Sequence, residues 1–282
     1  MRIAENGTCR HMRRPTKRIA NLFFSHGGIH AMYMYVGAIG TLHQNSHRLH
    51  PNLRVYGCSV GAFAALLVLL VLKGVVSIDE IEHELERALG GTERFQSDFT
   101  RLAIPLLETL FHKLDGVKVL ALVNHRLHIG VSSAASFEWV FQYKTIHELC
   151  HVLMLSANLP LISSYDRTYL DGGIRFELRF LPIRTFILYN LTYFPKSCIV
   201  PANETKRKLV SYGVDFTSDY LSNKRGLYDK NLHVNENRYN TAVIYLMFAL
   251  HRTLTVENVE WSERLQRLQC LHRSSLRPRQ SA

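Results

Sequence analysis

The sequence RVYGCSVGAFAALLVLLVLK, from Arg54 to Lys73, decides how this chain folds. A short apolar strand is expected to end at Tyr56 and to run into the sequence Gly57-Cys58-Ser59-Val60-Gly61. An apolar helix follows at once. This is the G-x-S-x-G pattern of a nucleophile elbow, in which a tight strand-to-helix turn exposes a serine hydroxyl group. The pattern alone is weak, but a strand before it and an apolar helix after it are the context that supports it.

The residue types of this turn predict a serine nucleophile at Ser59. Glycines at Gly57 and Gly61 avoid collisions with the neighbouring strand and helix. Backbone N–H groups and the positive end of the helix dipole gather at the start of the helix and favour a developing oxyanion. We therefore expect Ser59 to attack a carbonyl group, the alternative being an ordinary tight turn without chemistry.

The composition is that of a folded and strongly basic chain. Its 282 residues are enough for one large domain or two small ones. Of these residues 47% are hydrophobic and 10% aromatic, which is enough to build a core and excludes a disordered protein. The 34 basic and 23 acidic residues give a net charge of +11, which predicts attraction to an anionic partner. Residues 1–17 and 263–282 are expected to be basic, flexible ends of a domain at residues 18–262.

The cysteines and the apolar runs bear on location. Five scattered cysteines favour free thiols in a reducing compartment over a disulfide framework. Residues 1–18 lack the apolar core of a secretory signal. The most apolar run, 62–76, is broken by Lys73 and Gly74 and is too short to span a bilayer. We therefore expect an intracellular protein, cytoplasmic or peripherally membrane-associated, with no signal peptide and no transmembrane helix.

The rest of the chain alternates between strands and helices. Residues 18–24 predict a strand, and a glycine loop at 25–31 leads from it into a helix. The order strand, loop, helix, strand, elbow, helix predicts two successive parallel-strand units. The later expected elements are a helix opened by a capping box at 77–80, a strand at 125–131, a helix at 137–155, a strand at 185–192 and helices at 205–221 and 242–253.

Three motifs stand in a defined order: the glycine loop, the serine elbow and, far downstream, Leu170-Asp171-Gly172-Gly173. With these motifs the chain resembles the patatin-like phospholipases over about residues 18–195. The run Ala157-Asn158-Leu159-Pro160 before the aspartate is also similar to that family. The resemblance implies an α/β class and a three-layer patatin-like fold, in which a central, mostly parallel sheet has helices on both faces.

The resemblance also implies a Ser–Asp dyad that hydrolyses the ester bonds of phospholipids or acylglycerols. Ser59 would be the nucleophile and Asp171 its base, which must be desolvated and close to the serine to act near neutral pH. Backbone N–H groups of Gly27, Gly28 and Ile29 would form the oxyanion hole. No cofactor and no nucleic acid is expected, and the expected partner is a phospholipid membrane surface or a lipid substrate. The structural glycines of the motifs would be Gly57, Gly61, Gly172 and Gly173.

The glycine loop departs from the family pattern. His26 stands at its first glycine, His30 at its basic position and Ala31 at its last glycine. A catalytically impaired protein that acts as a basic membrane-binding module is therefore an alternative.

Two other chemistries compete. His147, Glu148 and His151 fit the pattern H-E-x-x-H, which on a helix can bind zinc with the glutamate as base. No third ligand follows at a recognised spacing, so we expect no metal. An α/β-hydrolase triad would need a late histidine such as His233 or His251, but its elbow normally follows several strands and this one follows a single strand.

Overall fold

A computed structural model describes residues 18–89, 103, 107–108, 111, 114–158, 166, 168–182, 184–188 and 201–222. The expected basic ends, the expected helix at 242–253 and the late histidines His233 and His251 lie outside the described residues. Cys58 and Cys150 are free, buried thiols, as expected from the scattered cysteines, and the other three cysteines are also outside these ranges.

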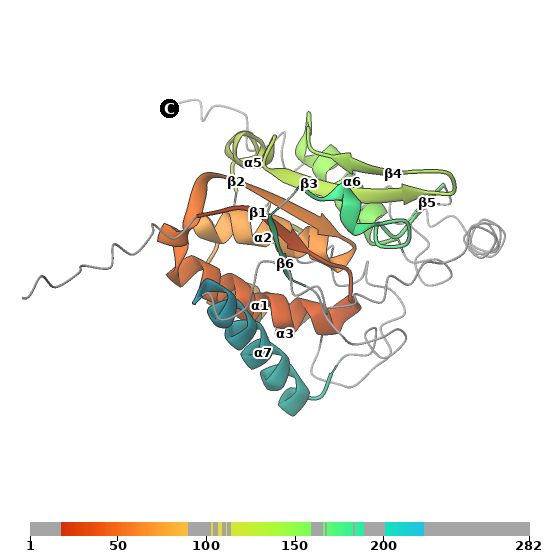
Figure 1. The fold of residues 1–282 in the computed structure, drawn as a ribbon. Coiled ribbons are helices and arrows are strands. Elements are labelled where there is room, and N and C mark those ends of the chain that lie inside the picture. The colour runs from red at the N-terminus through yellow and green to blue at the C-terminus, as the bar shows by residue number, and fades with distance from the viewer. Residues whose placement is uncertain are drawn as a thin grey trace, which may run out of the picture.

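The described residues form an α/β structure around one mixed, mostly parallel sheet (Figure 1). Its strand order is β4-β3-β2-β1-β6, and β5 also pairs with β3. The parallel strands are β1 (Ile19–Phe24), β2 (Leu49–Cys58), β3 (Leu127–Ser133) and β6 (Thr185–Leu188), and the antiparallel ones are β4 (Phe137–Val140) and β5 (Tyr169–Leu170). The helices are α1 (Gly28–Gln44), α2 (Val60–Leu72), α3 (Ile78–Leu89), α5 (Gly116–Val123), α6 (Ile146–Ser156) and α7 (Asn203–Leu221), with short 3₁₀ turns η1 (Ser46–Arg48) and η2 (Leu178–Phe180).

The parallel pairing confirms the two units predicted from the element order. Helix α1 connects β1 to β2, and Phe24 then lies opposite Gly57 in parallel register. Helices α2, α3 and α5 lie between β2 and β3, where Cys58 is opposite Gly130. A strand that returns parallel to its predecessor needs such a helical crossover.

Helix α2 is the centre of the packing. Every residue from Val60 to Val71 is buried, because the helix contacts α1, α5, α6 and strands β1, β2 and β3. A helix enclosed in this way is apolar on all sides, as this sequence is. Its 13 residues span roughly 20 Å, less than the ~30 Å core of a bilayer. No helix in the described ranges is long and apolar enough to cross a membrane.

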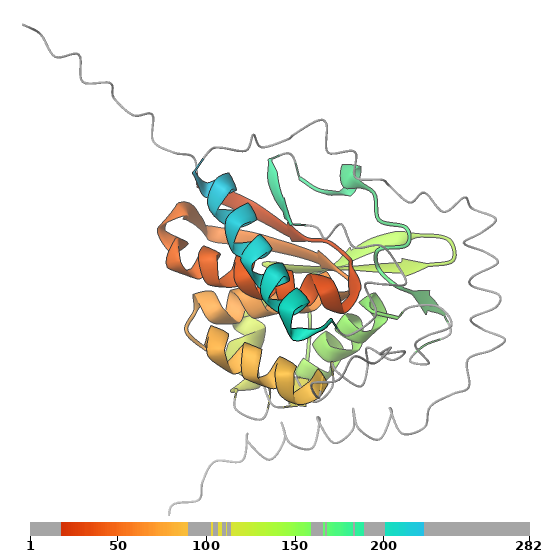
Figure 2. The ribbon, with the colours of Figure 1, turned by 90° about the horizontal axis from the view of Figure 1, so that it is seen from below.

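The two faces of the sheet are covered differently. Apolar residues from the six helices form one continuous core with alternate strand residues such as Leu22, Val55 and Ile129. Figure 2 shows α7 lying along α1 on this side. The other face carries a cluster of aromatic residues that includes Phe23 and Tyr56, and no described α-helix contributes to that cluster.

The helix predicted at 137–155 is wrong in its first part. Phe137–Val140 is strand β4, which pairs antiparallel with β3. Phe137 and Trp139 alternate with polar or exposed neighbours and pack in the aromatic cluster, a period of two that belongs to a strand. The tight turn before β4 is closed by the Ser133 hydroxyl, which accepts the N–H groups of Ala135 and Ser136.

The helix in the second part begins only at Ile146. The Thr145 hydroxyl accepts the Glu148 N–H at 3.0 Å, and the Glu148 carboxylate accepts the Lys144 N–H at 2.7 Å. This capping arrangement sets the start of α6 and went unrecognised in the sequence.

The predicted capping box at Ser77 and Glu80 is confirmed. The Ser77 hydroxyl accepts the Glu80 N–H at 3.1 Å, and the Glu80 carboxylate accepts the Ser77 N–H at 2.9 Å. Helix α3 follows with Ile81 and Leu85 buried. The predicted strands near 18–24, 125–131 and 185 and the helix near 205–221 are also present, with bounds that differ by one or two residues where they are described.

Candidate active site

The turn around Ser59 has the geometry of a nucleophile elbow. Strand β2 ends at Cys58 and α2 begins at Val60, with Ser59 between them at φ 57° and ψ −134°. A residue other than glycine rarely adopts a positive φ, and such strain collects at functional sites. The serine side chain therefore sits at the N-terminus of α2, where the helix dipole favours negative charge.

The flanking glycines allow this turn to close. A Cβ atom on Gly57 would collide with the backbone of Gly61, and one on Gly61 would collide with the carbonyl groups of Phe24 and Ser25. The start of α2 thus packs directly against the end of β1. Larger residues at Gly57 or Gly61 would force these backbones apart.

Strand pairing brings Asp171 to the elbow from far along the chain. The last residue of β2 lies opposite Gly130 of β3. Strand β5 pairs antiparallel with the continuation of β3, and Leu170 lies opposite Ser132. Because β5 runs back toward the end of β2, the next residue, Asp171, arrives beside Ser59.

The Asp171 carboxyl group is buried and only half satisfied. Oδ1 accepts the Gly173 N–H at 2.8 Å, whereas Oδ2 has no hydrogen-bond partner. Burial raises the pKa of Asp171 from 3.8 to about 6, against the lowering effects of the Ser59 hydroxyl and the Gly173 N–H. Ser59 is therefore close enough to affect the carboxylate, although no hydrogen bond of normal geometry joins them. An unpartnered buried acceptor beside a hydroxyl group is able to take its proton.

Ser156 ties the two halves of the site together, and the sequence reasoning missed it. It is the fully buried last residue of α6. Its Oγ accepts the Ser59 N–H at 2.9 Å and donates to the Gly130 carbonyl at 2.7 Å, while its own carbonyl accepts the Gly172 N–H at 2.7 Å. The sequence did contain one indication of its role. Ser156 directly precedes Ala157, the first residue of the run before Asp171 that is similar to the patatin-like family.

The glycine loop lies between β1 and α1. Gly27 and Gly28 have φ values of 154° and 62°, which glycine adopts without strain. Helix α1 begins at Gly28, so the N–H groups of Gly28 and Ile29 belong to a first turn that has no intrahelical acceptors. Such a helix start suits an anion.

This loop contacts both other motifs. The Ser25 carbonyl lies against Gly61 and accepts a 2.6 Å hydrogen bond from the buried Tyr35 hydroxyl. On the other side the His26 ring packs on Gly173 and fills the space that a Cβ atom would need. The glycine loop, the elbow and the aspartate turn are therefore contiguous. The hydrogen bond from Tyr35 holds the loop in position.

The residues that depart from the family pattern fit into this arrangement. His30 and Ala31 are buried within α1, and the Ala31 N–H bonds to the Gly27 carbonyl, so Ala31 needs no positive φ. His26 is an exposed residue, yet protein atoms crowd its imidazole, and this desolvation lowers the pKa of His26 below 6.5. His26 is thus neutral at pH 7.

His147, Glu148 and His151, the residues of the H-E-x-x-H pattern, lie on α6. Across the described ranges, no group of three His, Cys, Asp or Glu side chains is placed to hold a metal ion. Glu148 instead caps the start of the helix. Burial lowers the pKa of His151. The zinc alternative therefore finds no third ligand here.

Two comparisons with known proteins found no match. No protein-family model matches this chain, and no curated protein matches it. The likeness to patatin-like phospholipases thus depends on the three motifs and on the arrangement of the residues that carry them.

Proposed function

We propose that this chain is a serine lipid acyl hydrolase of the patatin-like type, with Ser59 as nucleophile and Asp171 as base. The observation that carries the proposal is the unpartnered Asp171 Oδ2, buried next to the Ser59 hydroxyl. The finer fold assignment, a three-layer patatin-like domain at residues 18–262, belongs to the same proposal. It requires a second helical layer over the aromatic cluster, and no described α-helix contributes to that cluster, because the six described helices pack in the core of the other face. The support for the assignment is the parallel β1, β2 and β3 arrangement with the elbow between β2 and α2.

The reaction is acyl transfer followed by hydrolysis. Asp171 takes the Ser59 proton as Oγ attacks the ester carbonyl carbon, and it returns that proton to the departing alcohol when the ester C–O bond breaks. A water molecule, deprotonated by the same carboxylate, then releases the fatty acid and restores Ser59. A pKa of about 6 leaves Asp171 mostly ionised at pH 7 and more basic than an ordinary aspartate.

The oxyanion formed in each step needs donors. The N–H groups of Gly27, Gly28 and Ile29 would supply them, since the glycine loop packs against both the elbow and the aspartate turn. Neutral His26 beside Gly173 adds no fixed charge to this site. It does fill space there that a glycine would leave open.

The substrate class proposed is the phospholipid or acylglycerol ester at an anionic membrane surface. The net charge of +11 supports peripheral binding, with each basic contact worth about 1 kcal/mol near such a surface. Flotation with neutral and anionic liposomes measures this. Binding that ignores both lipid charge and salt contradicts the electrostatic part of the proposal.

A fluorophosphonate probe and a chromogenic ester test the nucleophile on the full chain. We expect labelling and ester hydrolysis in the wild type, neither in Ser59→Ala, and slow reaction in Asp171→Asn. Ser136→Ala, a change at an exposed serine in the turn before β4, is the matched control and should react like the wild type. Labelling of Ser59→Ala equal to the wild type would refute the proposal.

The remaining outcomes identify the alternatives. Loss of activity on chelation indicates zinc chemistry, and full activity in Asp171→Asn indicates a different base. A folded wild type that neither reacts with the probe nor cleaves the ester, yet binds anionic liposomes, favours the impaired membrane-binding module. The observation behind that alternative is the presence of His26, His30 and Ala31 in the glycine loop.

A further inference from the structure

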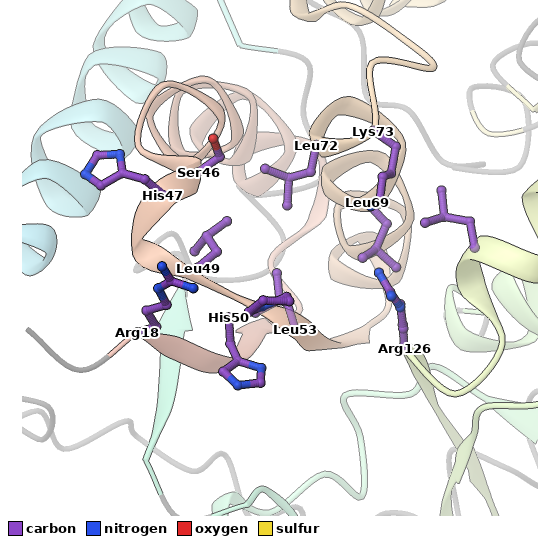
Figure 3. A pocket seen from close by; sticks show the side chains of 12 residues that line it. Arg18, Ser46, His47, Leu49, His50, Leu53, Leu69, Leu72, Lys73 and Arg126 are labelled. Carbon is purple, nitrogen blue, oxygen red and sulfur yellow. The ribbon is translucent and has the colours of Figure 1, made fainter.

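A cavity of about 290 Å³ opens at the end of α2 that is remote from Ser59 (Figure 3). The start of β2, the end of α2, η1 and the turn before β3 surround it. Strand β2 runs from Leu49 at the cavity to Cys58 at the elbow, and α2 returns from Val60 to Leu72. Since 13 helical residues span roughly 20 Å, the cavity is separate from the candidate active site.

The floor of the cavity is hydrocarbon. Leu49, Leu53 and Leu69 are buried beneath it, and the less buried Leu72 and Leu122 complete its lining. Its volume is near the lower end of the roughly 300–1,000 Å³ usual for small-molecule sites. Burying an apolar acyl chain against such a surface is favourable because it removes apolar area from water, whereas a small hydrated ion gives no such stabilisation.

The rim of the cavity is cationic. Arg18 stands on one side, and Lys73 and Arg126 stand on the other (Figure 3). His47 and His50 also line the cavity, and none of its described lining residues is acidic. None of the three charged groups forms an ion pair with an acidic residue of the described ranges. Uncompensated guanidinium and ammonium groups at the mouth of a cleft attract an anion, and guanidinium groups fit a carboxylate well.

We propose that this cavity binds the carboxylate form of a fatty acid, with the acyl chain on the leucine floor and the carboxylate at the basic rim. Inorganic phosphate is complementary in charge to the basic rim alone, and a neutral alcohol is complementary in polarity to the leucine floor alone. A fatty acid is complementary to both. A bilayer is the poorer occupant, because docking at this end would turn Ser59 away from the lipid. That last argument rests on the proposed function; the site itself does not. If the chain hydrolyses lipid esters, the ligand is of the class of its product.

Photo-crosslinking locates the ligand directly. The full chain carrying Ser59→Ala is irradiated with a diazirine derivative of dodecanoate, and the labelled peptides are identified by mass spectrometry. No Lys or Arg lies between Arg54 and Lys73, so one tryptic peptide carries Ser59, Leu69 and Leu72, and fragment-ion spectra are needed to assign the labelled residue. We expect labels at or beside Leu69, Leu72 and Leu122. Labels confined to the residues next to Ser59 and Asp171 would overturn the proposal.

Titration with dodecanoate tests the charge match. The double variant Lys73→Gln/Arg126→Gln removes two charge-assisted contacts and should weaken binding by about tenfold or more. Lys118→Gln/Arg207→Gln removes the same charge from exposed positions outside the cavity and should change binding less than about twofold. Equal losses in the two variants would contradict a defined carboxylate site.

Three further titrations separate the possible ligands. Dodecanol and inorganic phosphate should each bind far more weakly than dodecanoate, and tight binding of either one alone would contradict the two-part recognition. Binding to anionic vesicles without binding to monomeric dodecanoate would identify a membrane contact instead. Fluorophosphonate labelling of Ser59 is scored separately, so the hydrolase proposal and this one fail independently.

Discussion

The two ends of α2 differ in how their polar groups are stabilised. At its N-terminus, Ser59, Ser156 and Asp171 are buried polar groups, and a fixed set of hydrogen bonds holds the backbone around them. At its C-terminus, Lys73 and its basic neighbours face solvent and have no acidic partners in the described ranges. Burial raises the pKa of Asp171 to about 6, which solvent would prevent.

This contrast shows that the polar groups at the two ends of one helix should respond differently to substitution. A buried polar site depends on each of its hydrogen-bond partners, because a buried donor or acceptor that loses its partner cannot form a hydrogen bond with water instead. The groups of an exposed cationic rim stay hydrated, so the loss of any single charge changes the stability of the fold very little. The following predictions test this difference, beginning with the helix that both ends share.

Leu67→Asp should disrupt both ends at once. Leu67 is 1% exposed in the middle of α2, so the substitution buries an unpaired carboxylate. We expect a loss of about 4 kcal/mol or more, comparable with the whole stability of a domain. Thermal and urea unfolding followed by circular dichroism measure it. Val117→Asp, at a position that is 57% exposed, should stay within about 0.5 kcal/mol. A stable Leu67→Asp protein would mean that α2 is not the centre of the core.

The next largest effect is a pH dependence of stability caused by Asp171. Its pKa rises from 3.8 to about 6 on folding, so the folded state binds the proton more tightly. This stabilisation is complete below about pH 3.8 and is lost as the pH rises through about 6, a change of about 3 kcal/mol. In Asp171→Asn this contribution is absent, so the stability of the variant relative to wild type should increase over that range and level off above it.

Urea unfolding of both proteins between pH 4 and 7.5 provides the measurement. Ser136→Ala, which removes no titratable group from an exposed turn, serves as the control and should show no such relative change. A flat difference between Asp171→Asn and wild type would show that the carboxyl group is not desolvated. If the proposed function holds, the hydrolysis rate of the wild type should rise through about pH 6, because only the ionised carboxylate is a base.

Ser156→Ala should damage the buried end with a smaller loss of stability. The Ser59 N–H and the Gly130 carbonyl each lose their partner, which costs about 1–3 kcal/mol. Because the elbow loses its anchor, we expect kcat for ester hydrolysis to fall about 10–100-fold with a smaller change in KM.

Ser132→Ala is the comparison for that variant. Ser132 is equally buried and donates to the Gly172 carbonyl at 3.2 Å, but none of its hydrogen bonds reaches the elbow. The rate of fluorophosphonate labelling at Ser59 should therefore fall more in Ser156→Ala than in Ser132→Ala. Equal effects would show that Ser156 acts only through the aspartate turn.

The smallest effect is expected at the exposed end. Lys73→Gln and Arg126→Gln should each change the free energy of unfolding by less than about 0.5 kcal/mol. Ester hydrolysis in the absence of added fatty acid should be unchanged. Unfolding in urea and initial rates on the same ester measure these quantities. A loss above about 1 kcal/mol would mean that the basic rim supports the fold, and the contrast between the two ends would then be weaker than we infer.

Local sequence patterns predicted many of the secondary-structure elements and turns. The Ser77–Glu80 capping box, the elbow at Ser59 and the strand before Ser25 were all readable because each depends on neighbours within a few residues. The order of these elements also predicted two successive parallel-strand units, whereas the mostly parallel sheet was what the family resemblance implied. The helix wrongly extended over Phe137–Val140 shows the limit, since an alternation over only four residues is too short to be separated from the helical segment that follows until its partner strand is known.

The amino-acid sequence by itself determined where the backbone turns and which helix is buried, because glycine, capping residues and apolar periodicity act over short distances. Only the tertiary structure decided that β5 would carry Asp171 back to Ser59, that Ser156 would hold both turns, and that leucines and basic residues from four segments would enclose a cavity. Those contacts join residues far apart in the chain, and their energies depend on burial and distance, which no local pattern contains.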